Sequence, residues 1–182
     1  MAQEPASHPG CPRPDRIQTV REWVVAGGLI ESDDGLLLVH NLRRNGLLDW
    51  SPPGGVIEVH EGESVVDGLT REVAEETGIT VTEWEGPVYL VEAVAAGLGW
   101  HLRVEVHRAL SYAGTLRVDD PDGIVVDARF VPLDACEDHL AACHLWVREP
   151  LAAWLAERWS DGRAYRYRLD GDQIGAVQVV RV

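Results

Sequence analysis

Hydrophobic and polar residues alternate in several separate stretches of the chain, and this pattern predicts strands. The clearest case is 100–110, where Leu102, Val104 and Val106 alternate with polar or charged neighbours, as on a strand with one buried face. The turn-forming residues at 31–35 separate two apolar segments that we expect to pair as a hairpin. The predicted strands are 18–30, 36–40, 80–84, 88–94, 100–110 and 123–131, with a C-terminal hairpin over 163–182.

An apolar spacing of three to four residues predicts helices elsewhere in the chain. Val66, Leu69 and Val73 would form the buried stripe of one helix. Ser64 suits its N-cap, and Gly78 suits the position that ends it, because glycine adopts a left-handed conformation at little cost. Two further helices are predicted over 134–142 and 147–159. Strands and helices mixed in this way indicate an α/β fold.

The chain has the length of one domain with a substantial core. Residues 1–16 contain four prolines and few side chains to bury, so we predict a flexible tail there. The main domain is expected over 17–160, and 161–182 would extend the same domain with the C-terminal hairpin. A hairpin in that position could also form the contact of a homodimer.

Three carboxylates lie on one turn of the first predicted helix. Glu75 and Glu76 follow Glu72 at spacings of three and four residues, so the three side chains project from neighbouring positions. Like charges at this spacing destabilise an isolated helix by roughly 0.2–0.5 kcal/mol per pair. A divalent cation converts the repulsion into coordination, because hard ions such as Mg²⁺ prefer carboxylate oxygens.

The segment that contains these acids resembles the Nudix box of the Nudix hydrolases. In the family pattern, a glycine, five residues, a glutamate and seven residues precede Arg-Glu, an aliphatic residue, any residue, Glu-Glu, any residue, glycine and an aliphatic residue. From Glu63 onward the match has no exception. It runs through Arg71-Glu72, Val73, Glu75-Glu76, Gly78 and Ile79.

The first half of the box departs from the family pattern. Seven residues separate Gly55 from Glu63 instead of five, which indicates a two-residue insertion around Val59-His60. The resemblance implies a Nudix-type α/β/α sandwich with a mixed β-sheet, in which the box forms a loop, a helix and a loop. It also implies hydrolysis of a phosphoanhydride (pyrophosphate) bond in a nucleoside diphosphate linked to another moiety.

The resemblance also implies roles for the box residues. Glu75 and Glu76 would be the principal ligands of Mg²⁺ or Mn²⁺, and Glu72 would be a further ligand or the base that deprotonates water. Glu63 would support Arg71 or touch the metal through water. The planar guanidinium of Arg71 would orient the carboxylates.

Residues outside the box helix complete the expected metal site. By resemblance, the carbonyl of Gly54 would supply a further metal oxygen. An additional acid often comes from outside the box in this family, and Glu105 and Asp127 are candidates because each falls on the polar face of a predicted strand. A solvated strand carboxylate is the alternative reading of either residue.

Substrate recognition is less readable from the sequence than the metal site. Trp50 and Trp100 could stack on a nucleobase, and Arg43 and Arg44 could pair with phosphates. Tryptophans of small α/β domains also serve in the core, and arginines also serve at the surface, so both readings stay open. Further candidates of the same kind are Tyr89, Arg103 and His60.

Composition narrows the range of partners and compartments. The net charge is −14, from 30 acidic and 16 basic residues, which argues against binding to nucleic acid or to an anionic membrane. The three cysteines suggest neither a disulfide framework nor a zinc site. Without a signal peptide or a membrane-spanning run, a cytoplasmic protein is expected.

The sequence therefore predicts an enzyme that acts on a small nucleotide-type substrate. The alternative is a catalytically silent module of the same fold that senses a nucleotide in the same pocket. All box carboxylates are present, which disfavours the silent module. A metal-dependent isomerase on this fold is a third possibility with less support.

Overall fold

A computed structural model describes residues 20–171 and 177–182, so the tail predicted at 1–16 lies outside the described residues. The strands are β1 (Arg21–Leu29), β2 (Glu31–Ser32), β3 (Gly35–Leu42), β4 (Leu48–Ser51), β5 (Ile79–Ala95), β6 (Trp100–Gly114), β7 (Val125–Val131), β8 (Arg163–Asp170) and β9 (Gln178–Arg181). The helices are α1 (Val65–Thr77), α2 (Cys136–Leu140) and α3 (Leu145–Glu157), with short 3₁₀ turns η1 (Val59–Glu61), η2 (Ala96–Leu98) and η3 (Leu133–Ala135). None of the helices in the described ranges is long and apolar enough to cross a membrane.

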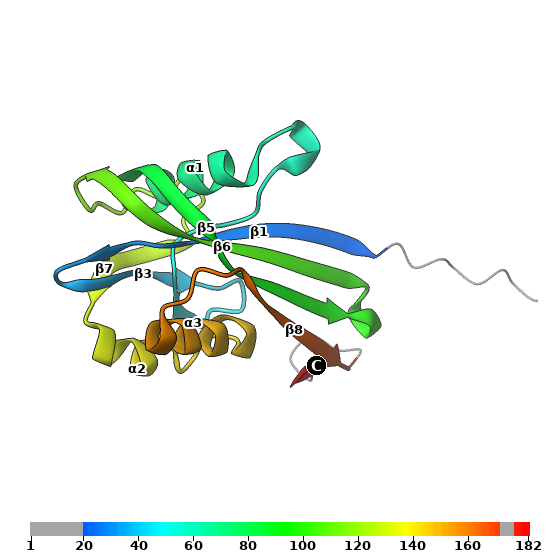
Figure 1. The fold of residues 1–182 in the computed structure, drawn as a ribbon. Coiled ribbons are helices and arrows are strands. Elements are labelled where there is room, and N and C mark those ends of the chain that lie inside the picture. The colour runs from blue at the N-terminus through cyan, green and yellow to red at the C-terminus, as the bar shows by residue number, and fades with distance from the viewer. Residues whose placement is uncertain (1–19, 172–176) are drawn as a thin grey trace, which may run out of the picture.

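The strands form two sheets between layers of helices. The larger sheet has the order β1-β6-β5-β8-β9 and is mixed, with β1 parallel to β6 and β5 parallel to β8. In the smaller sheet, β3 pairs with β2, β4 and β7, antiparallel in each case. Figure 1 shows α1 on one side of the sheets and α2 and α3 on the other. The predicted α/β/α sandwich with a mixed sheet is therefore confirmed.

Two groups of buried side chains hold the layers together. Leu69 and Val73 of α1 pack in one group with Leu37 of β3. Leu151 and Trp154 of α3 belong to the other group, which covers the opposite side of the sheets. Fully burying an aliphatic side chain of this size contributes about 1.5–3 kcal/mol, so these contacts fix α1 relative to the sheets.

The predicted hairpin between 18–30 and 36–40 forms only next to its turn. There β2 pairs with the start of β3, and the Leu37 amide donates to the Ile30 carbonyl at 2.8 Å, whereas β1 pairs with β6 along its whole length. The other edge of β1 is occupied by the loop that precedes the box helix. There, the Ala26 amide donates to the Gly55 carbonyl at 3.0 Å and the Gly28 amide to the Pro53 carbonyl at 2.8 Å. Because both edges are paired elsewhere, β1 has no free edge for β3.

The segments predicted as two strands at 80–84 and 88–94 form the single long strand β5. Its pairing with β6 shifts between Glu85 and Tyr89. Gly86 and Pro87 lie at this interruption, where proline has no amide hydrogen to donate to a neighbouring strand. The Gly-Pro pair therefore interrupts the pairing without ending the strand.

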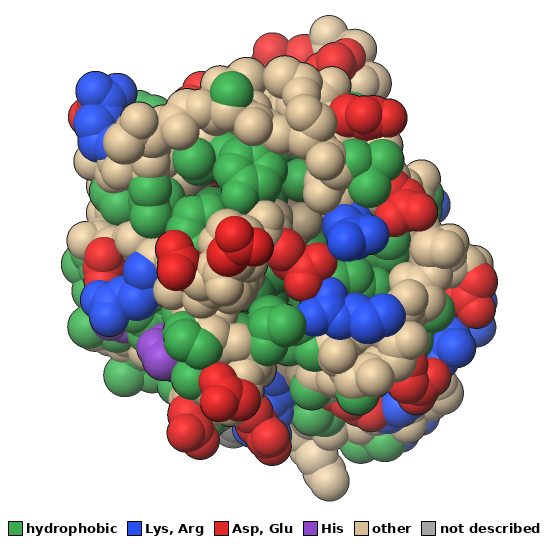
Figure 2. All heavy atoms as spheres, turned by 60° about the vertical axis from the view of Figure 1, so that its left-hand side comes forward, with side chains coloured by type: hydrophobic (Ala, Val, Ile, Leu, Met, Phe, Trp, Pro, Cys, Tyr) green, Lys and Arg blue, Asp and Glu red, His purple; other side chains and the backbone are tan. Residues whose placement is uncertain are grey.

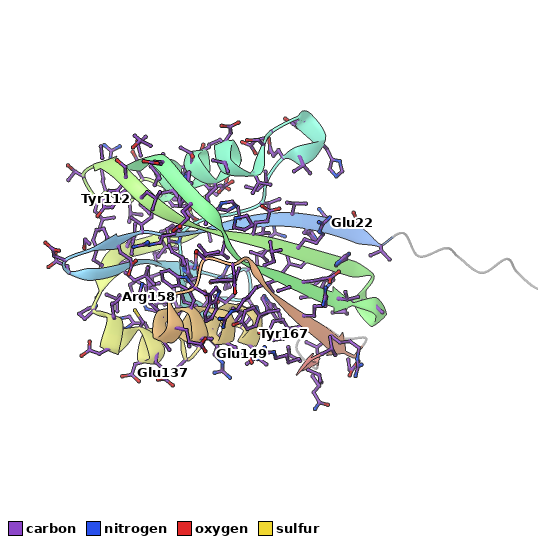
Figure 3. All side chains as sticks on the ribbon, viewed as in Figure 1. Glu22, Tyr112, Glu137, Glu149, Arg158 and Tyr167 are labelled. Atoms are coloured by element: carbon purple, nitrogen blue, oxygen red, sulfur yellow. The ribbon has the colours of Figure 1, made fainter. Side chains whose placement is uncertain are left out.

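The C-terminal strands extend the larger sheet and are fastened to α3. β8 and β9 pair antiparallel, as the predicted hairpin requires. Figure 3 shows the side chains of Tyr167 and Glu149 meeting between β8 and α3, where the tyrosine hydroxyl donates to the carboxylate at 2.9 Å. Arg181 of β9 donates to the other oxygen of Glu149 at 2.6 Å. One carboxylate thus joins both strands to the helix.

Acidic and basic side chains alternate over part of the surface. Glu31 pairs with Arg158 at 2.6 Å and with Arg108 at 3.3 Å. Figure 2 shows red and blue side chains interspersed with apolar ones on the face that includes the left-hand end of Figure 1. On this face, the acidic excess of the sequence does not form one continuous negative field.

α1 lies where the sequence predicts it, but its buried stripe begins one residue earlier. Leu69 and Val73 are fully buried, as expected, whereas Val66 is 39% exposed. Val65 packs against the core in its place. The sequence pattern alone could not separate the two valines, because both fit a spacing of three to four residues.

Truncation of α1 side chains tests this assignment of the buried face. Leu69→Ala should lower the free energy of unfolding by about 2–5 kcal/mol, because it leaves a cavity in the core. Val66→Ala should change it by less than about 0.5 kcal/mol, since the side chain is already exposed. Urea titration followed by circular dichroism measures both, and equal losses would contradict the assignment.

Candidate active site

Local capping fixes both ends of the helix that carries the acids. The Ser64 hydroxyl oxygen accepts a hydrogen bond from the Asp67 amide at 3.1 Å, which satisfies one of the free amides of the first turn. Gly78 ends α1 with a φ of 70°, in the left-handed region that glycine tolerates. Both ends agree with the sequence prediction. The helix therefore presents its acids at the positions that the spacing indicated.

The loop before the box helix packs directly on two of the acids. The Gly54 amide donates to Glu76 Oε2 at 2.8 Å. Gly54 has a φ of 138°, and a Cβ there would lie 2.2 Å from the Ala26 carbonyl oxygen. A Cβ on Gly55 would lie 2.4 Å from Glu72 Oε2. Gly54 is thus required by its close approach to the backbone of β1, and the two glycines bring backbone within reach of the carboxylates.

The two extra residues of the box are accommodated in the turn η1. This turn spans Val59–Glu61 and is closed by Gly62, which has a φ of 91°. Immediately before it, the Glu58 amide donates to Glu63 Oε2 at 3.0 Å. The insertion therefore forms an exposed turn whose two ends are held together. Glu63 keeps its contact with the box helix.

Arg71 joins three of the box carboxylates. Its Nε and Nη2 donate to the two oxygens of Glu63 at 2.9 and 3.1 Å. Its Nη1 donates to Glu72 at 2.8 Å and to Glu75 at 3.1 Å. The hydrogen bond to Arg71 lowers the pKa of Glu63, and the surrounding carboxylates raise the pKa of Arg71. The structure thus brings together the box residues that the sequence singled out.

Burial makes Glu76 the most perturbed acid of the site. Its residue is 8% exposed, and this burial raises the pKa of Glu76 to about 8, with smaller contributions from the charges of Glu72 and Asp120. Burial also raises the pKa of Glu72, against the opposing effect of Arg71. Negative charge is therefore gathered where water can stabilise it only poorly.

Asp120 and Asp122 are acids near the box that the sequence analysis missed. Their charges raise the pKa of Glu76 and Glu72 respectively, so they lie within electrostatic reach of the box. The loop that carries them is joined to the end of α1 by the Arg117 amide, which donates to the Thr77 carbonyl at 2.8 Å. The Asp-Asp-Pro-Asp-Gly sequence at 119–123 was the available signal, but it also has the composition of an ordinary turn.

Glu105 and Asp127 have partners other than the box acids. Glu105 is on β6, 3.4 Å from His107, in a groove of about 540 Å³ on the larger sheet. Asp127 is on β7 and pairs with Arg129. Its neighbour in register is His40 of β3. Neither acid is among the charges that perturb Glu72 or Glu76.

Each of the two candidate tryptophans packs against other aromatic side chains. Trp50 is held among other side chains, with its ring stacked on His40 at 4.4 Å and beneath the Arg129 guanidinium at 4.9 Å. Trp100 meets Trp146 edge to face at 6.5 Å. Trp146 in turn stacks on His144 at 4.1 Å, so Trp100 belongs to an aromatic group at the start of α3.

The two candidate arginines differ in their surroundings. Arg43 is bound to the buried carboxylate of Asp49 and lies close enough for its charge to lower the pKa of Glu76. Arg44 is exposed at the β3–β4 turn and has no ion pair within the described residues. Arg43 is therefore within electrostatic reach of the box acid Glu76.

The carboxylate oxygens of the box suit a divalent cation, although in this structure they are hydrogen-bonded to other groups of the protein. Within the described residues, no three acidic, histidine or cysteine side chains already form a ligand cluster. Glu72 and Glu75 instead bind Arg71, and Glu76 binds the Gly54 amide. Hard oxygen donors around a buried, partly uncompensated carboxylate match the preferences of Mg²⁺ or Mn²⁺. Small side-chain rotations would exchange these partners for a cation.

Comparison with known proteins identifies the family. A model of the NUDIX domain matches residues 21–155, which is most of the chain. The chain therefore belongs to the Nudix hydrolase family, whose members generally hydrolyse pyrophosphate bonds in nucleoside diphosphate derivatives. A comparison with curated proteins gives no match.

Solved structures agree with this assignment. A MutT NUDIX hydrolase from Burkholderia pseudomallei is 28% identical, with a TM-score of 0.54 over 63% of this chain and 85% of that chain. A Mutator MutT protein from Bacillus halodurans is 21% identical, with a TM-score of 0.60 over 86% and 97%. The E. coli ORF135 protein is 22% identical, with a TM-score of 0.61 over 80% and 99%. The last two show likeness of fold.

The raised pKa of Glu76 makes the stability of the metal-free protein depend on pH. A folded-state pKa above the unfolded value means that the folded state loses stability as pH rises from about 4.5 to about 8. Glu76→Gln removes this charge and keeps an oxygen for the Gly54 amide. In EDTA, the unfolding free energy of the variant relative to wild type should therefore rise by about 4 kcal/mol between pH 5 and pH 9.

Chemical denaturation at the two pH values measures this difference. Glu61→Gln is a matched control, because Glu61 is exposed on η1. If the difference in unfolding free energy between Glu76→Gln and wild type does not change with pH, Glu76 is not the perturbed group.

Proposed function

We propose that this protein is a divalent-metal-dependent hydrolase of the phosphoanhydride bond in a nucleoside diphosphate linked to another moiety. The observation that carries the proposal is the contact of Glu72 and Glu76 with the Gly54–Gly55 loop, with Glu75 joined to Glu72 through Arg71 and with Glu76 buried. A solely structural helix gains nothing from this arrangement, since the acids repel one another.

Each group has a role that follows from its position. Glu75, Glu76 and the Gly54 carbonyl would hold Mg²⁺ or Mn²⁺, and Glu72 would be a further ligand or the base that receives a proton from water. Bound cations supply a more acidic water and polarise phosphoryl oxygens. Asp120 is a better candidate for the additional acid than either strand carboxylate, because its charge already reaches Glu76.

Arg71 acts on the acids and not on the substrate in this proposal. All three guanidinium nitrogens are engaged by Glu63, Glu72 or Glu75. Glu63 receives two of these bonds and is itself held by the Glu58 amide. The pair would keep Glu72 and Glu75 in place when a cation arrives, as outer groups do for metal ligands generally.

The aromatic group at the start of α3 supports a substrate with a nucleobase. His144 is exposed and stacks nearly parallel on Trp146, with 11° between the rings. Loss of hydration around the ring lowers the pKa of His144, which favours its neutral form. A flat neutral surface of this kind suits stacking of a base.

Activity against a panel of nucleotides tests the proposal. Nucleoside triphosphates, nucleotide sugars and dinucleotides are incubated with Mg²⁺, and the phosphorylated products are separated by ion-exchange chromatography. Glu75→Gln and Glu76→Gln should each lower kcat by at least about 100-fold, since even outer groups of a metal site cost 10–100-fold. Glu61→Gln should retain wild-type activity.

Two results would oppose the proposal. Tight binding of a nucleotide without hydrolysis by the wild type would favour the sensing module. Hydrolysis that is unaffected by either box substitution would place the metal site elsewhere.

A further inference from the structure

A buried ion pair joins the two strands of the β3–β4 hairpin near the proposed active site. Arg43 Nη2 donates to Asp49 Oδ1 at 2.7 Å, and Arg43 Nε donates to Oδ2 at 2.9 Å. The arginine side chain is 41% exposed, whereas the aspartate side chain is 9% exposed. The carboxylate is therefore the fixed partner, and the arginine is the partner that reaches solvent.

The geometry of this pair leaves one edge of the guanidinium open. A guanidinium is planar and can meet two oxygens along either of two edges. Asp49 occupies the edge formed by Nε and Nη2, and Nη1 has no hydrogen-bond partner within the described residues. The free edge, which includes Nη1, matches the spacing of two phosphate oxygens.

Asp49 is itself held by neighbouring polar groups. Asn41 Nδ2 lies 3.4 Å from Asp49 Oδ1 and donates to Ser51 Oγ at 3.0 Å. Asn41 and Asp49 are paired in register, so these polar side chains share one face of the hairpin. Leu37 of β3 is on the same face and belongs to the core group of α1. The polar group therefore faces the side of the sheet that α1 covers.

Arg43 belongs to the hairpin that leads into the box loop. β4 ends at Ser51, and Gly54, whose amide donates to Glu76, follows three residues later. An arginine on this hairpin has the box acids as alternative partners. Arg71 does pair with box acids, namely Glu63, Glu72 and Glu75. Arg43 binds none of these box acids, and the carboxylate that it does bind is Asp49.

We propose that Asp49 is a positioning residue that holds Arg43 toward the substrate's phosphate and away from the metal-binding carboxylates. The inference rests on the proposed function, since it assigns a phosphorylated substrate to the same site. Asp49 touches neither substrate nor metal. It fixes the plane of the guanidinium by one edge and leaves the other edge for phosphate oxygens. It also prevents Arg43 from competing with the cation for Glu76.

A double-mutant cycle in steady-state kinetics tests the first part. With the best substrate of the panel and saturating Mg²⁺, Asp49→Asn should raise KM by about tenfold and change kcat by less than about threefold. Arg43→Gln should raise KM by a similar factor. In the Arg43→Gln background, Asp49→Asn should add nothing further, because it acts through Arg43.

Binding of Mn²⁺ to the substrate-free protein tests the second part without any turnover. Free Mn²⁺ is measured by electron paramagnetic resonance during a titration. In Asp49→Asn, the released Arg43 should compete for the box acids and raise the Kd for Mn²⁺ by roughly threefold or more. In the Arg43→Gln background, Asp49→Asn should change the Kd for Mn²⁺ only slightly, through the loss of the Asp49 charge.

Glu149→Gln is a matched control for both measurements. Glu149 also joins neighbouring elements through an arginine, Arg181, but it does so on α3 at the C-terminal strands. Thermal denaturation gives the melting temperatures of Glu149→Gln and Asp49→Asn for comparison. Glu149→Gln should lower the melting temperature without moving KM or the Kd for Mn²⁺.

Several outcomes would overturn the inference. If Asp49→Asn lowers only the melting temperature, the pair serves solely to join the hairpin. If KM falls instead of rising, the loss of a negative charge near the substrate is the whole effect. If the effects of the two substitutions on KM simply add, Asp49 does not act through Arg43.

Failure of the proposed function gives a different result. In that case the wild type hydrolyses no member of the nucleotide panel. The Mn²⁺ titration then still decides the inference, with an unchanged Kd in Asp49→Asn counting against it.

Discussion

Repulsion among the carboxylates of α1 is the constraint on which the arrangement of the site depends. Glu72 and Glu75 share a single nitrogen of Arg71, and Glu76 has a backbone amide as its partner. These hydrogen bonds give each carboxylate a donor, but one guanidinium and one amide do not neutralise three negative charges. Burial raises the pKa of Glu76, and the charges of Glu72 and Asp120 raise it further. A bound divalent cation would remove the imbalance that the protein's own groups leave.

The position of the loop opposite these acids is set by β1. That strand pairs with β6 along one edge and with the loop along the other, through the Ala26–Gly55 and Gly28–Pro53 hydrogen bonds. Gly54 can lie so close to β1 only because it lacks a Cβ. The larger sheet therefore fixes the backbone that touches Glu76, while the core under α1 fixes the acid itself. The insertion in η1 is tolerated because it lies outside this chain of contacts.

The features that the sequence predicted well are those encoded by local spacing. The extent of α1, its Ser64 cap, its terminal Gly78 and the common face of its acids all follow from residues within a few positions of one another. The box spacing even located the insertion, which η1 now accounts for.

The features that failed depend on pairing between distant segments. No local signal showed that β1 would pair with β6 and the box loop in preference to β3. Asp120 was missed for the same reason, since only the fold brings the 119–123 turn to the end of α1. Arg43 was recognised as a candidate, but its partner Asp49 lies across a hairpin. The sequence therefore indicated the cation and not the carboxylate that holds it.

The two arginines near the acids show how an acidic protein can admit a phosphorylated substrate. Arg71 is fully engaged by the acids and adds no free positive charge. Arg43 is neutralised by Asp49, so it offers directed donors with little net attraction. The chain as a whole carries a net charge of −14, which repels anions at long range. Cations bound at the box would then supply most of the attraction for a pyrophosphate, and in the proposed arrangement Arg43 would orient it. Metal binding would accordingly precede productive binding of the substrate.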